Sequence, residues 1–254
     1  MSDPVKLTIY PSGAAEIVID RPERHNAMTL DMYESLLALV AECEQNPGVR
    51  CILFRGAGGK SFISGTDIAY FKDFRDGRDG VSYEAFVERV IDAVERIAVP
   101  TVAVIDGWAV GGGLALATAC DFRVCSDGSR FGAPIAKTLS NTLSSRNIAR
   151  LQAALGVPRV KKMLLLADYV TAEEALACGY VYDVCSQDAL QETAHTLAQR
   201  LMALSPVTQK AVKESLRRIV VEQRLDDEDL IETVYGSTNF RDAVAAFTSG
   251  ASKK

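Results

Sequence analysis

Residues 105–114 read IDGWAVGGGL, and this stretch decides the fold. An apolar strand expected over 101–105 enters it, and the three glycines of 111–113 lead into the apolar, alanine-rich segment 114–119. Glycine lets the backbone approach another group closely, and the first N–H groups of a helix have no partner inside that helix. The stretch therefore either packs a helix tightly onto a strand or presents backbone N–H groups to a ligand.

A second glycine-rich connection lies upstream. Residues 61–68 read SFISGTDI and follow the strand expected over 49–55 and the glycines of 56–59. This places their backbone at the carboxyl end of a strand, where α/β proteins bind ligands. Neither connection has the Gly-x-Gly-x-x-Gly spacing of dinucleotide-binding proteins or the full Gly-x-x-x-x-Gly-Lys-Ser/Thr pattern of a P-loop. A nucleotide-binding α/β protein is thus disfavoured.

Strands and helices are expected to alternate in the first part of the chain. Segments 7–10 and 15–19 predict a β-hairpin, and Thr29 is a typical cap for the helix that follows. Residues 70–90 predict a helix, a mobile loop around DGRDG at 76–80, and a second helix. Later elements are a helix at 84–97, a strand at 101–105, a buried helix at 114–119 and a strand at 122–125. The alternation indicates an α/β core.

The pattern changes near residue 146. Beyond it the chain predicts helices at 146–155, 158–166, 172–177, 190–204, 206–225 and 230–248, with one strand near 180–184. We therefore expect an α/β core over 1–145 and a helical region over 146–254, which ends in a frayed tail at 251–254. Helices with two apolar faces need a second surface to cover them, which suggests oligomerisation.

Composition narrows the class of protein. A net charge of −5 argues against a nucleic-acid surface, and no apolar run is long enough to span a membrane. The first residues, MSDP, lack the features of a secretory signal, so we expect a soluble cytoplasmic protein. Six cysteines without CxxC spacing and only two histidines make a metal site improbable and indicate reduced thiols.

Several motifs occur together in a recognisable order. They are PERHNAM at 22–28, FISGTDI at 62–68, GWAVGGG at 107–113, CD at 120–121, FGAP at 131–134, TAEEA at 171–175 and GYV at 179–181. In this order and at these separations they closely resemble the crotonase (enoyl-CoA hydratase/isomerase) superfamily over nearly the whole chain. The resemblance implies an α/β, ClpP/crotonase-like spiral of ββα turns, followed by a C-terminal helical region that forms a homotrimer or hexamer.

The resemblance also implies a chemistry. Family members bind an acyl-CoA thioester and stabilise its enolate with two backbone N–H groups, which by position are those of Thr66 and Gly112. No cofactor is implied beyond the coenzyme A of the substrate. His25, in the first motif, is interpreted as a bystander to catalysis. The positions implied to contact coenzyme A are Arg24, Ala27, Ser64, Asp67 and Ile68.

The chain departs from the hydratase pattern at two positions. Hydratases of this superfamily carry one glutamate two residues after the triple glycine and another just after the proline of the FGAP motif, where this chain has Ala115 and Ile135. Neither side chain can donate or accept a proton, so hydration should be very slow. The superfamily's single-glutamate isomerases are excluded by Ile135 as well. We therefore expect a reaction that passes through an enolate, with an acid or base that the motifs do not identify.

Several replacements stay open. Asn141 stands where superfamily decarboxylases use a tyrosine, and it could orient a carboxylate or a water within the polar run 137–147, which could equally be a loop and helix cap. Acids in the segment that covers the acyl pocket of relatives could supply a base. The alternatives are a decarboxylase, a C–C or thioester hydrolase, or a non-catalytic acyl-CoA-binding paralogue. The covering segment contains Tyr70, Asp73, Tyr83, Glu84 and Glu88.

Overall fold

The structure, a computed structural model, describes residues 3–249 and contains two sheets. The larger sheet has the order β1-β2-β3-β5-β7-β10, and the smaller has the order β4-β6-β8-β9. Pairs β1–β2 and β8–β9 are antiparallel, and the other pairs are parallel. The strands are β1 (Val5–Ile9), β2 (Ala14–Ile19), β3 (Cys51–Gly56), β4 (Ser61–Ile63), β5 (Thr101–Ile105), β6 (Trp108–Val110), β7 (Phe122–Ser126), β8 (Arg130–Gly132), β9 (Val170–Thr171) and β10 (Asp183–Cys185).

Three successive ββα turns build both sheets at once. The first strands of these turns, β3, β5 and β7, lie side by side in the larger sheet, and the second strands, β4, β6 and β8, lie side by side in the smaller one. A helix follows each pair of strands: α2 (Gly77–Arg96), α3 (Gly112–Ala119) and α4 (Ser145–Leu155). This is the spiral of ββα turns that the resemblance implied.

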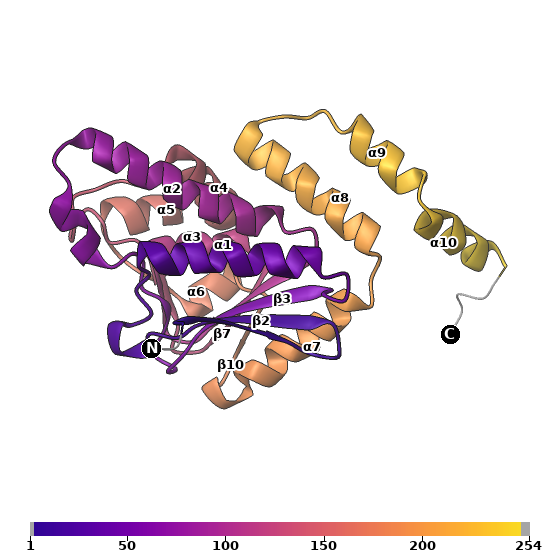
Figure 1. Cartoon of the computed structure of the whole chain (residues 1–254), viewed down its shortest axis with the longest axis horizontal. Helices are drawn as coiled ribbons and strands as arrows, with labels where there is room; N and C mark the ends of the chain where they lie inside the picture. Colours follow the sequence, from indigo (N-terminus) through magenta and orange to yellow (C-terminus); the bar gives the residue numbers. More distant parts are fainter. Residues whose placement is uncertain (1–2, 250–254) are drawn as a thin grey trace.

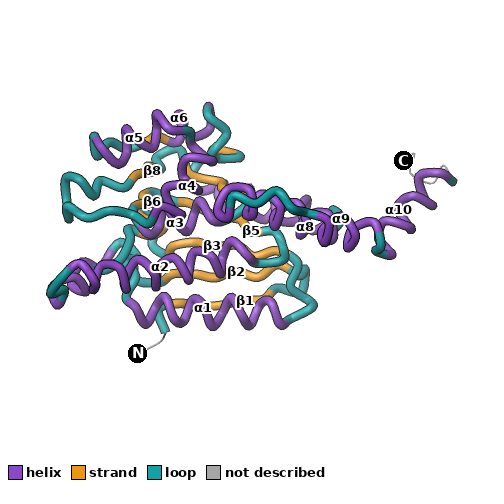
Figure 2. Tube along the Cα trace, turned by 90° about the horizontal axis from the view of Figure 1, so that it is seen from above, coloured by secondary structure: helices purple, strands orange, loops and turns teal. Residues whose placement is uncertain are grey.

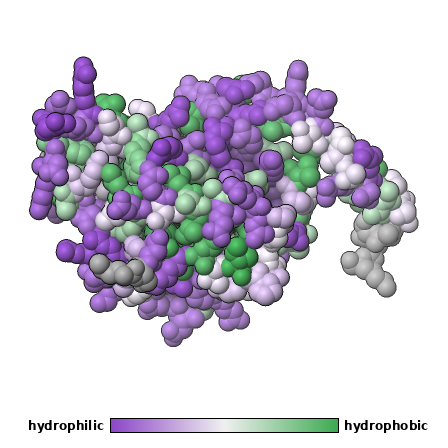
Figure 3. Space-filling model, in the orientation of Figure 1, coloured by the Kyte–Doolittle hydropathy of each residue, from purple (hydrophilic) through white to green (hydrophobic). Residues whose placement is uncertain are grey.

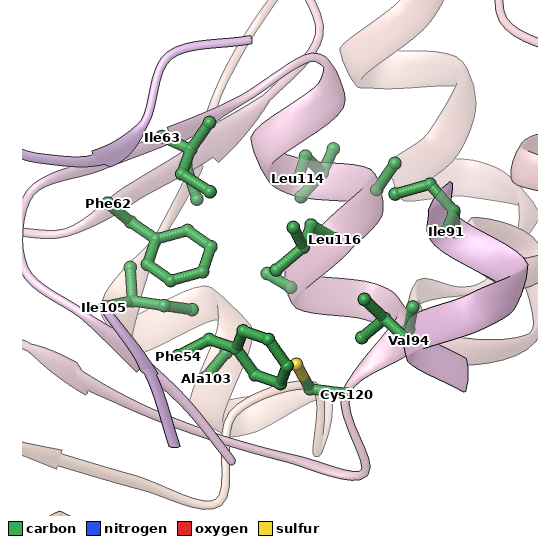
Figure 4. Close-up of a cluster of buried hydrophobic side chains, with 14 of the residues drawn as sticks. Phe54, Phe62, Ile63, Ile91, Val94, Ala103, Ile105, Leu114, Leu116 and Cys120 are labelled. Carbon is green, nitrogen blue, oxygen red and sulfur yellow. The ribbon is translucent and has the colours of Figure 1, made fainter. Parts of the chain in front are cut away.

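Helices cover both faces of the larger sheet. Helices α1 (Leu30–Gln45), α2 and α3 lie on one face, and α7 (Leu190–Met202) lies on the other (Figure 1). Buried apolar side chains form a large cluster under the first group and a smaller cluster under α7. Leu114 and Leu116 of α3 lie between the side chains of the strands and those of Ile91 and Val94 on α2 (Figure 4). The apolar, alanine-rich helix predicted here is thus confirmed as the centre of the core.

The N-terminal predictions are confirmed except in one segment. The hairpin forms, and Thr29 Oγ1 accepts a hydrogen bond from Met32 N at 3.2 Å to cap α1. The loop predicted at 76–80 is wrong, because α2 already begins at Gly77 after the short helix η2 (Ile68–Asp73). Asp76 caps α2 by accepting from Arg78 N at 2.8 Å. The glycines there lie in the first turns of a helix, where local caps outweigh their low helix propensity.

The second half of the chain is less purely helical than predicted. Strands β9 and β10 complete the two sheets; β10 overlaps the strand predicted near 180–184, whereas β9 was not predicted. The single helix predicted over 230–248 is wrong: it is divided at Gly236, and Ser237 caps the second part by accepting from Phe240 N. The remaining helices are α5 (Val157–Leu165), α6 (Ala172–Ala177), α8 (Pro206–Arg217), the π-helical turn η4 (Arg218–Glu222), α9 (Glu228–Tyr235) and α10 (Thr238–Thr248).

The C-terminal helices extend away from the sheets. In two perpendicular views α9 and α10 project beyond the body formed by the spiral (Figures 1 and 2). Hydrophobic side chains also gather over the middle of the face seen in Figure 3. Within residues 3–249 no helix is long and apolar enough to cross a membrane. The predicted tail at 251–254 lies outside the described residues. Large apolar side chains are exposed on the C-terminal segment at Leu225, Ile231, Tyr235, Val244 and Phe247.

Candidate active site

The two glycine-rich connections meet at one cavity. Its volume is about 440 Å³, and it is lined by Ser64, Gly65 and Thr66 after β4 and by residues 110–112 after β6. Strands β4 and β6 are neighbours in the smaller sheet, so their carboxyl ends deliver both connections to the same edge. The topology therefore brings together two segments separated by more than forty residues.

Backbone N–H groups of both connections are without partners. Met28 N donates to Gly65 O at 2.8 Å, and Asp67 N donates to Met28 O at 2.9 Å. The N–H of Thr66, between them, makes no hydrogen bond to any residue in 3–249. Gly112 is the first residue of α3, and within the same described range its N–H has no acceptor either. Two donors, one of them at the positive end of a helix, thus border the cavity.

The glycines are needed for packing as well as for access. A Cβ added at Gly113 would lie only 2.0 Å from the carbonyl oxygen of Ile63, so α3 packs directly on the backbone of β4. Gly65 has φ +100°, which other residues rarely adopt. The two interpretations of the glycine-rich stretch that the sequence left open therefore describe one arrangement: the close approach that packs α3 also sets its N–H groups beside Thr66.

A chain of three hydroxyl groups lies beside these N–H groups. The hydroxyl of Thr66 is 3.0 Å from that of Tyr33 and 2.6 Å from that of Tyr83. Burial raises the pKa of Tyr33 to about 12 and also raises the pKa of Tyr83, so both phenols stay protonated. Three hydroxyl hydrogens serve two hydrogen bonds, which leaves one hydrogen free for another acceptor. Pattern analysis missed Tyr33, which is fully buried on α1.

The residues expected to contact coenzyme A divide into two groups. Ser64 and Ile68 line the cavity, and the side chain of Ile68 is largely exposed. Asp67 instead accepts from Ala69 N at 3.0 Å, which caps η2, and pairs with Arg21 at 2.8 Å. These bonds lower the pKa of Asp67 and keep it ionised. Arg24 lies exposed on the short helix η1 (Pro22–Arg24), and Ala27 is half-buried.

The first motif is held together by residues that the sequence did not single out. Asn26 is fully buried, and its side-chain amide donates to the carbonyl oxygens of Ala57 at 2.9 Å and Ser61 at 2.7 Å. Its side-chain oxygen accepts from Arg21 N at 3.0 Å. Asn26 adopts φ +57°, a left-handed conformation that asparagine tolerates better than most residues. The asparagine at this position was therefore the available signal in the sequence. His25 lines the cavity but is exposed at its edge.

The positions of the two missing glutamates are apolar. Ile135 lines the cavity, and Ala115 is buried in the first turn of α3 among core side chains. Asn141 also lines the cavity, is exposed, and makes no hydrogen bond within residues 3–249. Thus neither Ala115 nor Ile135, the positions where hydratases are expected to have glutamates, provides an acid or a base.

The covering segment contributes two of its five candidates to the cavity. Tyr83 and Glu84 line it, whereas Tyr70, Asp73 and Glu88 do not. A second cavity of about 550 Å³ adjoins the first, because Tyr83 and Glu84 line both. Aromatic rings pack η2 against α2, since the ring centroids of Phe71 and Tyr83 are 4.9 Å apart. The two cavities together provide an apolar space next to the unpaired N–H groups.

Comparison with known proteins agrees with this geometry. Residues 10–248 match the family model described as Enoyl-CoA hydratase/isomerase. The chain belongs to the enoyl-CoA hydratase/isomerase family. It is 30% identical over 204 residues to a short-chain-enoyl-CoA hydratase of Clostridium acetobutylicum, over 80% of this chain and 77% of that protein. It is 26% identical over 237 residues to a crotonyl-CoA hydratase of Syntrophomonas wolfei, over 92% and 90% of the two chains.

A solved structure extends the likeness to three dimensions. An enoyl-CoA hydratase/carnithine racemase from Magnetospirillum magneticum superposes with a TM-score of 0.87 at 27% identity, covering 98% of this chain and 94% of that one. The predicted crotonase-type α/β fold is therefore confirmed. This member of the enoyl-CoA hydratase/isomerase family is an acyl-CoA enzyme by its family.

Proposed function

We propose that the protein binds an acyl-CoA thioester and stabilises its enolate with the N–H groups of Thr66 and Gly112. The observation that carries this proposal is that both N–H groups lack an acceptor within residues 3–249 while both residues line one apolar cavity. A thioester oxygen placed between them would receive two preorganised hydrogen bonds as negative charge develops on it. No cofactor is required in this scheme beyond the coenzyme A of the substrate.

Hydration of enoyl-CoA is proposed to be slow. Adding water across a double bond needs a group that activates the water and a group that protonates the α-carbon. Ala115 and Ile135 can do neither, and each positioned acid or base typically contributes about 10²–10⁴-fold to the rate. Relatives are named hydratases, so the proposal distinguishes this chain from proteins that it otherwise resembles.

The oxyanion site can be tested without knowledge of the natural substrate. In D2O an enolate-forming enzyme exchanges the α-hydrogens of butyryl-CoA or phenylacetyl-CoA for deuterium, which NMR and mass spectrometry detect. Gly112→Pro removes one N–H at the first helical position, where proline is tolerated. Its ring would meet the Tyr33 hydroxyl, which lies 2.7 Å from an added Cβ, so it is combined with Tyr33→Phe.

The expected result is a loss of about 10²–10³-fold in exchange for Gly112→Pro/Tyr33→Phe relative to Tyr33→Phe alone. Hydration of crotonyl-CoA by the wild-type protein should be far slower than exchange. Rapid hydration would contradict our interpretation of Ala115 and Ile135. Tight thioester binding with neither exchange nor turnover would support a non-catalytic acyl-CoA binder instead.

Decarboxylation of a 2-carboxyacyl-CoA is a second candidate. Loss of CO2 forms the same enolate without a base, and Asn141 lines the cavity with an amide that has no partner in the described chain. Such an amide could orient the departing carboxylate by a hydrogen bond. Release of CO2 from methylmalonyl-CoA, and its decrease in Asn141→Leu, would support this candidate.

The C-terminal helices are proposed to assemble copies of the chain into a trimer or a pair of trimers. Helices α9 and α10 project from the spiral and expose apolar side chains, among them Ile231, Tyr235 and Phe247. Exposed apolar surface of this kind is usually covered in an oligomer. Light scattering on the full chain would give the mass of the particle, and a monomer would contradict this proposal.

A further inference from the structure

One carboxylic acid borders the cavity where the two expected glutamates are missing. Among the described residues that line the 440 Å³ cavity, Glu84 is the only aspartate or glutamate. It lies in the second turn of α2 and is half-buried, and it also lines the adjoining 550 Å³ cavity. The cavity therefore has a proton acceptor, contributed by α2 and not by α3 or the segment after β8.

The Glu84 carboxylate is oriented by a main-chain hydrogen bond. Its Oε2 atom accepts from Ser144 N at 2.7 Å, at the N-terminal cap of α4. Its Oε1 atom has no hydrogen-bond partner within residues 3–249 and is not fully buried. One oxygen is thus fixed while the other stays free to accept a proton, which is the arrangement that a general base requires.

The groups around Glu84 keep it a stronger base than an ordinary glutamate. Burial raises its pKa, the Ser144 hydrogen bond opposes this, and the nearby Glu88 carboxylate raises it again. Glu88 is itself occupied, since it pairs with Arg150 at 2.7 Å and accepts from Ser144 Oγ at 3.0 Å. Tyr33 on α1 and Tyr83 on α2 face the same region as neutral phenols.

The other titratable residues of the cavity are less suited to the task. Tyr83 has a raised pKa because of its burial, and its hydroxyl is already bonded to Thr66 at 2.6 Å. His25 is exposed at the edge of the cavity in the segment assigned to coenzyme A. Tyr169 packs edge-on against Trp108, with 4.9 Å between ring centroids.

The geometry points to Glu84 as the general base that takes a proton from the acyl chain. This inference rests on the proposed function, because it needs the enolate to be stabilised at Thr66 and Gly112. In the step, Oε1 of Glu84 takes the proton from the α-carbon. The C–H electron pair becomes the C=C bond of the enolate, and the thioester oxygen takes the negative charge. Return of a proton from Glu84 regenerates the thioester, so atoms and electrons balance without a co-reactant.

The inference extends to substrate class. A base on α2 and the adjoining cavity lined by Phe71, Phe74 and Leu139 lie on the same side of the site. The acyl group that fits is thus an apolar or aromatic chain with an acidic α-hydrogen. Phenylacetyl-CoA has both properties, and butyryl-CoA serves as its short aliphatic counterpart.

Deuterium exchange of these two thioesters by the full-length protein tests the assignment. Glu84→Gln keeps the shape and the Ser144 hydrogen bond but cannot accept the proton, and exchange should fall by at least about 10²-fold. Asp73→Asn is the matched control, because Asp73 is an exposed carboxylate of the same covering segment that lies outside the cavity. It should exchange like wild type. Glu84→Asp should restore part of the lost rate.

The pH profile separates catalysis from a structural role. Exchange by wild type should fall as the pH is lowered through the raised pKa of Glu84, and the residual exchange of Glu84→Gln should lack this step. Thioester affinity, measured by calorimetry, should be similar in both. A Glu84→Gln protein that keeps wild-type exchange, or a His25→Gln protein that alone loses it, would overturn the assignment.

The two proposals fail in different ways. Exchange that is abolished by Gly112→Pro/Tyr33→Phe but retained by Glu84→Gln would leave the oxyanion site standing and refute only the base. Exchange that depends on Glu84 but not on Gly112 would refute the oxyanion site. Absence of exchange in the wild-type protein, with either thioester bound, would overturn both.

Discussion

The two halves of the candidate site are held in place by different interactions. The half that contains the proposed oxyanion donors, called the oxyanion half, consists of residues 64–67 and 110–113, which are fixed by neighbouring strands, by backbone hydrogen bonds and by the packing of Gly113 on Ile63. The acyl wall consists of η2, the start of α2 and the segment up to Ser144. It is held by side chains: the capping Asp76, the aromatic cluster and the contacts of Glu84 and Glu88 with Ser144.

This contrast explains which part of the chemistry can change. The positions of backbone N–H donors depend on the course of the main chain and not on side-chain identity, so the oxyanion half tolerates many side-chain substitutions. A proton acceptor must be a particular side chain, and any wall residue that reaches the cavity can supply one. In this chain the two expected glutamate positions are Ala115 and Ile135, while Glu84 on α2 borders the same cavity as Ile135. We therefore expect side-chain variants to disturb the wall and backbone variants to disturb the oxyanion half.

The largest expected change in the free energy of unfolding concerns the buried Arg150, which supports the acyl wall. Arg150 is 2% exposed and pairs with Glu88 at 2.7 Å and Glu95 at 2.9 Å. Arg150→Met leaves these carboxylates without their partner and should lower the free energy of unfolding by about 3–5 kcal/mol. Arg89→Met on α2 removes the exposed pair with Glu34 and the contact of the guanidinium with the Phe86 ring, 5.2 Å from its centroid, and should cost at most about 2 kcal/mol. Urea denaturation measures both.

An equal loss of unfolding free energy in the two arginine variants would show that the ion pairs linking α2 to α4 do not stabilise the acyl wall. Loss of exchange activity in Arg150→Met at temperatures where it remains folded would link the network to the orientation of Glu84.

A smaller loss is expected from the oxyanion half. Gly113→Ala places a methyl group 2.0 Å from the Ile63 carbonyl oxygen, in a buried backbone contact that cannot shift cheaply. The free energy of unfolding should fall by about 3 kcal/mol, at the upper end of typical overpacking. Gly80→Ala is the control in the wall: an added Cβ at Gly80 has no neighbour within 4 Å, so this helical position should gain about 0.5–1 kcal/mol. Opposite signs for the two variants are the prediction.

The smallest expected effect concerns Glu84 and stability. Its pKa is raised in the folded protein, so the native state binds this proton more tightly than the unfolded chain. Stability therefore falls as the pH rises through the raised pKa, and the penalty persists at neutral pH. Glu84→Gln should unfold at higher urea concentration than wild type at about pH 7, with the difference vanishing by about pH 4. A destabilised Glu84→Gln protein at neutral pH would contradict this.

Local patterns predicted most of the elements. The hairpin, the cap at Thr29, the buried helix after the triple glycine and the bounds of α6 follow from short-range signals, and all of them agree with the structure. The prediction of a loop at 76–80 was wrong because the Asp76 cap starts a helix there despite the low helix propensity of the two glycines. The two-residue strand β9 gave no signal in the sequence, because its partner strand β8, not its own residues, makes it a strand.

The residues of the candidate site also divide into those that local motifs indicate and those that only the tertiary structure identifies. The family resemblance, which rests on short motifs, nominated Thr66, Gly112 and the two altered positions, because a motif is a local property of the chain. The resemblance could not choose among Asp73, Glu84 and Glu88, because all three belong to the segment that it places over the acyl pocket. Nor could it find the Tyr33 hydroxyl beside Thr66, since Tyr33 belongs to a helix that precedes β3.

The sequence by itself determined the alternation of strands and helices, the glycines that let backbone approach backbone, and the absence of a glutamate at positions 115 and 135. Only the tertiary structure decided which side chains surround the cavity. The physical reason is range: caps, turns and periodicity act over a few residues, whereas the neighbours of Glu84 come from α1, α2 and the cap of α4. These groups meet only after the spiral has closed.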